Sequence, residues 1–158
     1  MTAFGGQDEK TGITEKIETY RADIETLVKF LPWLEAKNRQ NISSSYLPEG
    51  AEGAHAFHVP VYDSNLLNFV KVFQQTKFLN RNYMYLYHRK RIKTAEDELK
   101  VIADTQIMEI ETLGDILSNY VIRGMSKSVM WNDGVSKGVF YAAVNRMKEL
   151  LEFWTKPM

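Results

Sequence analysis

The chain has 158 residues, of which 44% are hydrophobic and 25% are charged, and its formal net charge at pH 7 is zero. This length and this composition are typical of one globular domain and exclude disordered and fibrous proteins. A net charge of zero argues against a surface built throughout to hold nucleic acid or an anionic membrane. The chain has no cysteine, which excludes disulfides and thiol nucleophiles and favours a cytoplasmic location.

The first twelve residues are polar and contain glycine, so we expect residues 1–12 to form a disordered tail and residues 13–158 to form a single helical domain. The tail has neither the basic region nor the apolar region of a signal peptide. No run of 18 apolar residues follows. Export and membrane spanning are therefore not expected.

From Ile13 to Leu34 the apolar residues recur at intervals of three and four, which predicts an amphipathic helix. Pro32 is expected to end or kink it, because proline has no backbone N–H. Residues 37–54 follow as a polar loop. Residues 54–62 are rich in β-branched and aromatic side chains and predict a short strand paired with residues 42–47, while Pro60 confines it to an edge.

Asp63 or Ser64 is a suitable N-cap for a helix that ends near Lys77. Further helices are predicted around residues 99–103, from 107 to 121 with Gly124 as the C-cap, and from 133 to 154. Residues 82–93 fit a strand or a helix equally well, since their tyrosines alternate and also recur every four residues. The fold class is therefore mainly α, a helical bundle of about five helices with a small β-ribbon or extended arm near residues 42–62.

The order of several short motifs resembles an uncharacterised family of small bacterial helical proteins, a domain of unknown function. The resemblance covers residues 27–153 and favours a helix over 83–93. It implies a shared fold and no particular activity. The motifs are Leu31-Pro32-Trp33-Leu34, Val59-Pro60-Val61-Tyr62, Ile110-Glu111-Thr112-Leu113, Trp131-Asn132-Asp133-Gly134 and Arg146-Met147-Lys148-Glu149-Leu150.

The strongest candidate for a functional surface is the basic, tyrosine-rich segment 81–93, because aromatic faces can stack on bases while cations hold phosphates. The competing interpretation is that the tyrosines pack on the core and the cations pair with the acidic block that begins at Glu96. We favour the second interpretation, since exposed ion pairs are common. The residues that would form the surface are Arg81, Tyr83, Tyr87, Arg89, Lys90 and Arg91.

A second candidate follows from Trp131 to Gly138. Gly134 and Gly138 lie four residues apart and predict a buried helix face that contacts a neighbouring helix. The functional alternative is a ligand pocket whose rim is formed by Trp131, Asp133 and Arg146. We favour the packing interpretation.

No enzyme class has a recognisable motif in this chain. His55 and His58 would point to opposite faces of a strand, which is poor geometry for one metal ion, and no phosphate loop or nucleophile motif occurs. Metal and cofactors are therefore not expected. The leading hypothesis is a non-catalytic module that self-associates or binds another protein, and the alternative is weak nucleic-acid binding through residues 81–93. A buried carboxylate beside arginine in a deep cleft would instead favour an enzyme.

Overall fold

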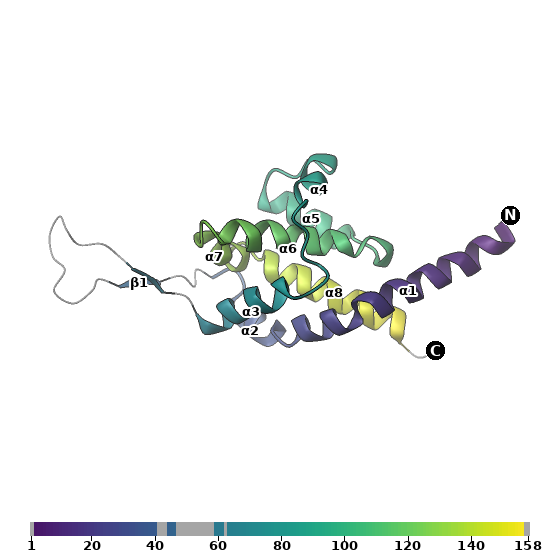
Figure 1. Ribbon diagram of the computed structural model, residues 1–158, viewed down its shortest axis with the longest axis horizontal. Helices are drawn as coiled ribbons and strands as arrows, with labels where there is room; N and C mark the ends of the chain where they lie inside the picture. The colour runs from purple at the N-terminus through teal and green to yellow at the C-terminus, as the bar shows by residue number, and fades with distance from the viewer. Residues whose placement is uncertain (1, 41–43, 47–58, 62, 157–158) are drawn as a thin grey trace.

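The computed structural model describes residues 2–40, 44–46, 59–61 and 63–156. Eight α-helices form most of this part of the chain, which confirms the prediction of a mainly helical fold (Figure 1). The estimate of about five helices is wrong, because two of the predicted helices are each divided and the ambiguous segment 82–93 contains one more. The helices are α1 (Thr2–Val28), α2 (Leu31–Lys37), α3 (Ser64–Gln74), α4 (Met84–Arg89), α5 (Ala95–Asp104), α6 (Glu111–Gly124), α7 (Val129–Ser136) and α8 (Val139–Thr155), with a 3₁₀ turn η2 (Ile107–Glu109) before α6.

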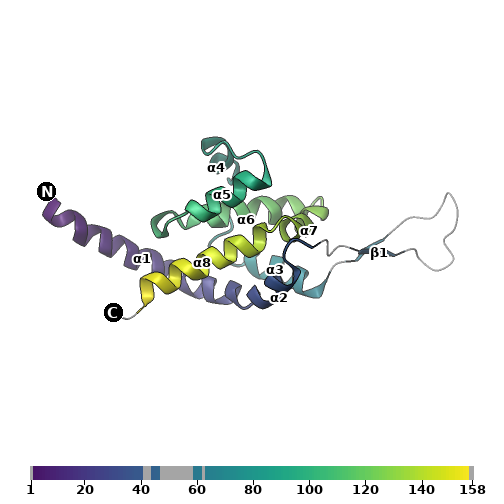
Figure 2. The ribbon, with the colours of Figure 1, turned by 180° about the vertical axis from the view of Figure 1, so that it is seen from behind.

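The first division lies between α1 and α2. Pro32 has no N–H to donate to the carbonyl of Val28, so the long helix ends there and α2 begins with Pro32 in its first turn, where proline is tolerated. At the other end, α1 starts at Thr2, whereas the sequence predicted a tail over residues 1–12. A helix nucleated on the buried stripe from Ile13 can extend into the good helix formers Gln7, Glu9 and Lys10. The start of α1 therefore projects beyond the body (Figures 1 and 2).

The second division lies at Gly138, between α7 and α8. Gly138 has a φ of 78°, in the left-handed region that favours glycine, and its N–H donates to the carbonyl of Val135 at 3.0 Å. The residue is buried, and an added Cβ would lie 3.2 Å from Oδ1 of Asn38. The prediction that Gly138 lies on a helix face is therefore wrong, because Gly138 forms the turn between two helices. Gly134 instead contacts the ring of Phe140.

Gly124 serves close packing and does not cap α6 as predicted. It is the last residue of α6, and Met125 is the C-cap with ordinary helical angles. The indole of Trp131 covers Gly124 so closely that an added Cβ would lie 2.0 Å from Nε1. That same Nε1–H donates to the carbonyl of Val121 at 3.1 Å. The missing side chain at position 124 therefore allows α7 to pack against the end of α6.

The core lies around α8, which packs against α1, α2, α5, α6 and α7. Figure 2 shows α8 running through the middle of the molecule, with α1 to α3 on one side and α4 to α6 on the other. Phe140 of α8 is fully buried, with its ring 5.0 Å from that of Phe69 and 5.8 Å from that of Tyr120. The Phe69 ring in turn meets that of Phe30 edge to face at 5.4 Å. Helices from both halves of the chain therefore share one apolar core.

Local sequence signals place several elements where the sequence predicted them. Asp63 caps α3, since its side chain accepts a hydrogen bond from the backbone N–H of Asn65 at 2.7 Å. The ambiguous segment 82–93 contains helix α4. Thr94 and Asp97 form a capping box that starts α5. The Asp63 cap therefore fixes the start of α3, and the capping box fixes the start of α5.

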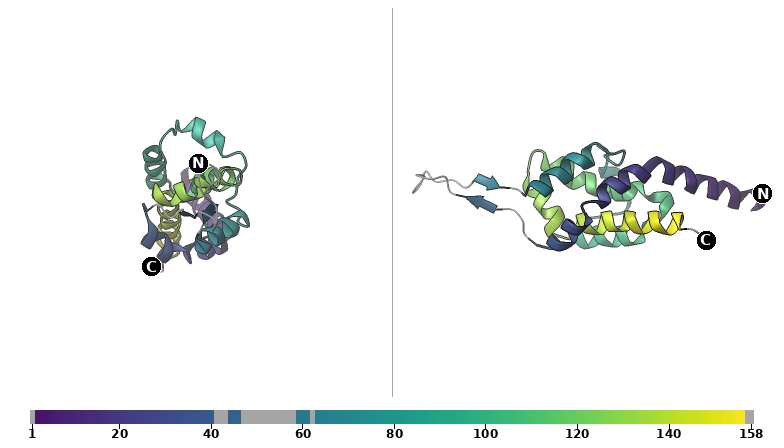
Figure 3. Two further views of the ribbon diagram at one scale, coloured as in Figure 1. Left: turned by 90° about the vertical axis from the view of Figure 1, so that its left-hand side faces the viewer. Right: turned by 90° about the horizontal axis from the view of Figure 1, so that it is seen from below.

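Two short strands, β1 (Ser44–Tyr46) and β2 (Val59–Val61), pair antiparallel with Ser45 opposite Pro60. They lie at the end of the molecule opposite the N-terminus (Figure 3). The remaining residues of the predicted β-ribbon, 42–43, 47–58 and 62, lie outside the described residues. Within the described residues, no helix has both the length and the apolar character needed to cross a membrane.

Candidate ligand-binding cleft

A cavity of about 730 Å³ lies where α4, α5 and α6 meet the end of α7. Ligand pockets commonly have volumes of about 300–1,000 Å³, so this cavity has the size of a small-molecule site. Apolar walls come from Met84, Ile92 and Met130. The charged and polar side chains around it fall into two groups, a buried cluster around Glu98 and an exposed set of cations. We call this cavity the cleft.

The carboxylate of Glu98 is the centre of the buried cluster. Glu98 shares the buried face of α5 with Ile102, and only 4% of its surface is exposed. The hydroxyl of Tyr87 donates to Oε2, and the hydroxyl of Tyr120 donates to Oε1, both at 2.5 Å. Hydrogen bonds to a charged acceptor are short and strong, so these two donors stabilise a carboxylate that would otherwise be costly to bury. Asn119, also buried, lies beside Tyr87 and opposes the rise of its pKa.

Burial controls the protonation of this cluster. Burial raises the pKa of the Glu98 carboxyl, while the tyrosine hydrogen bonds and the charges of Lys137 and Arg123 oppose that rise. Burial also raises the pKa of both phenols, and the neighbouring Glu98 carboxylate raises each further. Tyr87 and Tyr120 therefore keep their protons at neutral pH and remain donors to Glu98.

Four exposed cations line the same cleft: Arg91, Lys93, Arg123 and Lys137. None of them has a carboxylate within ion-pair distance in the part of the chain that the structure describes. Among the described residues that line the cleft, Glu98 is the one acid. The cleft therefore has a formal charge of about three positive units when Glu98 is ionised, although the whole chain is neutral. His88 also lines it.

The capping box of α5 explains why the nearby acids leave these cations unpaired. The Asp97 carboxylate accepts hydrogen bonds from the backbone N–H groups of Lys93 and Thr94, at 2.9 and 3.2 Å. These bonds lower the pKa of Asp97. Glu98, the next acid, accepts from the two tyrosines instead. Asp97 and Glu98 of the acidic block therefore bind backbone and phenol groups rather than the side chains of the basic segment.

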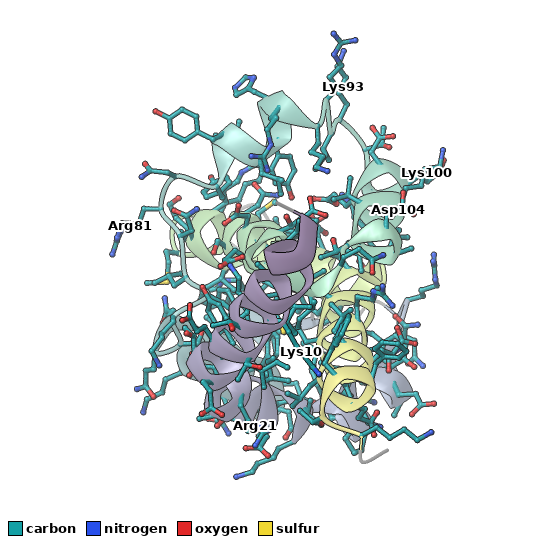
Figure 4. The ribbon with its side chains drawn as sticks, turned by 90° about the vertical axis from the view of Figure 1, so that its right-hand side faces the viewer. Lys10, Arg21, Arg81, Lys93, Lys100 and Asp104 are labelled. Atoms are coloured by element: carbon teal, nitrogen blue, oxygen red, sulfur yellow. The ribbon has the colours of Figure 1, made fainter. Side chains whose placement is uncertain are left out.

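The predicted surface over residues 81–93 is divided between different environments. Arg89 and Lys90 face acids around a second cavity of about 390 Å³, and Lys90 pairs with Glu109 at 3.9 Å. Arg91 lines the cleft, in a left-handed backbone conformation with a φ of 54°. Arg81 lines neither cavity, and Figure 4 shows it on a different side of the molecule from Lys93. The cations of this segment therefore do not form one continuous face.

The predicted tyrosines pack as half-buried side chains. Tyr87 reaches Glu98, as described above, and the rings of Tyr83 and Tyr87 meet edge to face at 6.3 Å. Tyr85, in contrast, is 78% exposed. Stacking of several tyrosines on successive bases would require their faces to be free, and two of these three rings already contact each other.

The predicted pocket rim of Trp131, Asp133 and Arg146 is not brought together. Trp131 packs on Gly124. Arg146 donates two hydrogen bonds, from Nε at 3.1 Å and Nη2 at 2.8 Å, to the carbonyl of Thr105, the C-cap of α5. None of the three predicted rim residues lines the cleft. The arginine instead joins α8 to the end of α5, which is a structural role.

Sequence reasoning missed Glu98, Asn119, Tyr120, Arg123 and Lys137. One signal was available for Glu98, which lies four residues before Ile102 and therefore on the apolar face of its helix. An acid in that position indicates a buried carboxylate with partners. No comparable signal exists for Lys137, because only the fold brings the end of α7 to α5.

His55 and His58 lie outside the described residues. Among the described residues, no three His, Asp or Glu side chains are grouped closely enough to hold a metal ion. Comparison of the chain with protein-family models, curated proteins and solved structures finds no match. The family resemblance therefore stays a prediction, and the cleft has to be interpreted from its own chemistry.

Proposed function

We propose that the protein binds a small anionic ligand in the cleft. One observation carries this proposal: four cations without carboxylate partners among the described residues surround a concave site that contains a single acid. Like charges gathered in a cleft repel one another and are stabilised when an anion binds. Arginine and lysine are also the side chains that most often hold phosphate and carboxylate groups.

The concave shape favours a small molecule over a polymer. A nucleic-acid strand would be held by cations along an extended groove, whereas Arg81, Arg89 and Lys90 lie away from the cleft. The lack of cysteine is compatible with the cytoplasm, where phosphorylated metabolites are abundant.

Pyrophosphate, a compact polyanion, is a suitable first probe. We expect its titration into ¹⁵N-labelled protein to shift the amide signals of residues 91–93, 119–123 and 137–138 and to leave those of α1 and α3 unchanged. The double substitution Arg123→Gln, Lys137→Met should weaken binding by about tenfold or more, because two charge-assisted contacts are lost. The matched control Arg21→Gln, Lys71→Met removes the same charge from exposed positions on α1 and α3.

Equal weakening by the control substitution would overturn the proposal, since it would show a general charge effect. An absence of shifts at the cleft with millimolar pyrophosphate would overturn it too. A single-stranded oligonucleotide provides the comparison for the nucleic-acid alternative, which we expect to bind only in the range of about 10⁻⁴–10⁻⁶ M at physiological salt. Submicromolar binding that is lost on changing Arg89 and Lys90, which do not line the cleft, to alanine would favour that alternative instead.

A second candidate function is the self-association predicted from the sequence, and it has its own observation. Phe153 is 70% exposed and Trp154 is 43% exposed near the end of α8, with their rings 5.1 Å apart. Exposed aromatic pairs of this kind are enriched in protein interfaces. Sedimentation velocity on the wild type and on Phe153→Ser, Trp154→Ser tests it. A concentration-dependent dimer that the substitutions abolish would support self-association, and a wild-type monomer at all concentrations would contradict it.

A further inference from the structure

The buried carboxylate in the cleft has capacity for two more hydrogen bonds. An ionised carboxylate offers about four acceptor positions, two on each oxygen. The hydroxyl of Tyr120 occupies one position on Oε1, and the hydroxyl of Tyr87 occupies one on Oε2. Glu98 also lines the cleft. One acceptor position on each oxygen is therefore left for a ligand that brings two neighbouring donors.

The charges around Glu98 indicate which kind of donor fits. Lys137 and Arg123 act on this carboxylate by their charge, and two further cations line the cleft. A ligand ammonium group would add positive charge where positive charge is already in excess, and it would be repelled. Two uncharged hydroxyl groups on adjacent carbons bring two donors without added charge. A vicinal diol is therefore the donor pair that suits this position.

The remaining lining suits the other parts of such a ligand. The cations can hold a phosphate, with the planar guanidinium groups of Arg91 and Arg123 able to make paired contacts with its oxygens. A cavity of about 730 Å³ is far larger than a lone phosphate requires. Met84, Ile92 and Met130 provide apolar surface for the carbon skeleton. Glu98 therefore suits the diol, the apolar side chains suit the carbon skeleton, and the cations suit the phosphate.

We infer that the ligand of the cleft is a phosphorylated polyol, either a sugar phosphate or a nucleotide, with two adjacent hydroxyl groups on Glu98 and its phosphate on the cations. This inference rests on the proposed function, because it requires that the cations bind an anion. Glu98 is then the residue that determines specificity, while the cations supply most of the affinity.

Two matched pairs of ligands test the inference: ribose 5-phosphate against 2-deoxyribose 5-phosphate, and AMP against its 2′-deoxy analogue, since neither deoxy compound keeps two adjacent ring hydroxyls. Titration calorimetry should show that the wild type binds the complete sugar at least about tenfold more tightly in one of the pairs, since the deoxy compound leaves a buried acceptor unpaired. AMP, which has the same vicinal diol as ribose 5-phosphate, distinguishes a nucleotide ligand from a free sugar phosphate. Tighter binding of AMP than of ribose 5-phosphate indicates a nucleotide, and the reverse indicates a free sugar phosphate.

Glu98→Gln should reduce the preference for the complete sugar to within about twofold, while pyrophosphate binding should stay equal or become tighter, because a negative charge is removed from the cleft. Glu96→Gln, an exposed acid of the same helix that does not line the cleft, is the matched control. Equal affinities within both ligand pairs, with pyrophosphate still bound at the cleft, would overturn this inference and leave the proposed function standing. Failure of pyrophosphate to bind would overturn both. If Glu98→Gln does not fold, the ligand pairs on the wild type decide alone.

Discussion

The core around Phe140 and the cleft around Glu98 are neighbouring regions built on opposite principles. Phe140 is fully buried in the apolar core, with its ring against that of Phe69. Glu98 is almost as buried, but it is held by two phenols at the floor of an open cavity. Tyr120 belongs to both, since its ring packs on Phe140 and its hydroxyl binds Glu98. The apolar region provides stability, and the polar region gives up close packing to keep a space with specific chemistry.

The largest expected effect is a loss of stability on substitution in the apolar core. Phe140→Ala should lower the free energy of unfolding by about 3–5 kcal/mol, because it removes a large buried ring and leaves a cavity. Urea denaturation measures the change. Phe153→Ala, an exposed position in the same helix, should change stability by no more than about 0.5 kcal/mol. Equal effects at the two positions would contradict the assignment of the core.

The next effect separates the two roles of Tyr120. Tyr120→Phe keeps the ring on Phe140 but removes the donor to Oε1 of Glu98, so we expect a loss of about 1–3 kcal/mol from the unpaired buried acceptor. The control is Tyr85→Phe at an exposed position, which should have almost no effect. If Tyr120→Phe also leaves the free energy of unfolding unchanged, the Tyr120 hydroxyl does not stabilise a buried Glu98 carboxylate, and the buried cluster described above is contradicted.

A smaller effect is expected at Gly138, beside the core. Gly138→Ala should destabilise the protein by about 1–2 kcal/mol, because a residue with a Cβ is strained at a φ of 78°. Gly12→Ala in α1 provides a comparison of opposite sign. It should stabilise by about 0.5–1 kcal/mol, since glycine weakens a helix and the group nearest to the new methyl is the flexible end of Met108. Thermal unfolding of both variants should shift in opposite directions.

The smallest expected effect is on how the free energy of unfolding depends on pH. The raised pKa of Glu98 means that the folded protein binds this proton more tightly than the unfolded chain does. Protonation of Glu98 therefore stabilises the folded protein fully below the ordinary glutamate pKa of about 4.3. This stabilisation is lost as the pH rises through the raised pKa of Glu98 in the folded protein. Between these two pKa values, the wild type should lose this stabilisation with rising pH while Glu98→Gln does not. The free energy of unfolding of the variant should therefore rise relative to that of the wild type. A difference that does not vary from pH 4 to pH 8 would contradict a desolvated carboxylate, and Glu96→Gln is the control.

Local interactions are what the sequence predicted well. The apolar period of α1, the Asp63 cap of α3 and the break before Pro32 each depend on residues a few positions apart. The same kind of reasoning failed at Gly138, because a glycine within an apolar period is equally compatible with a helix face and with a turn. Only the packing of α7 against α2 and α8 selects the turn.

The candidate site shows the same limit more clearly. The sequence identifies Tyr87 and Arg91 as residues of interest, with packing on the core and ion pairs to the acidic block favoured over a surface for nucleic acid, and neither interpretation predicts a cleft. A pocket rim of Trp131, Asp133 and Arg146 is the less favoured alternative in the sequence, and in the structure Trp131 and Arg146 donate to the carbonyls of Val121 and Thr105. Which groups a side chain meets across 10 to 40 residues depends on how the helices cross, and single-sequence patterns contain little information on that.

By itself, then, the sequence determined that the chain forms amphipathic helices, that Asp63 starts one of them, and that no known catalytic motif occurs in it. The tertiary structure decided that Glu98 of α5 meets Tyr87 of α4 and Tyr120 of α6, and that cations from three separate stretches of chain surround them. The physical reason is that helix formation depends on hydrogen bonds and side chains within four residues, whereas a site depends on contacts between elements far apart in the chain.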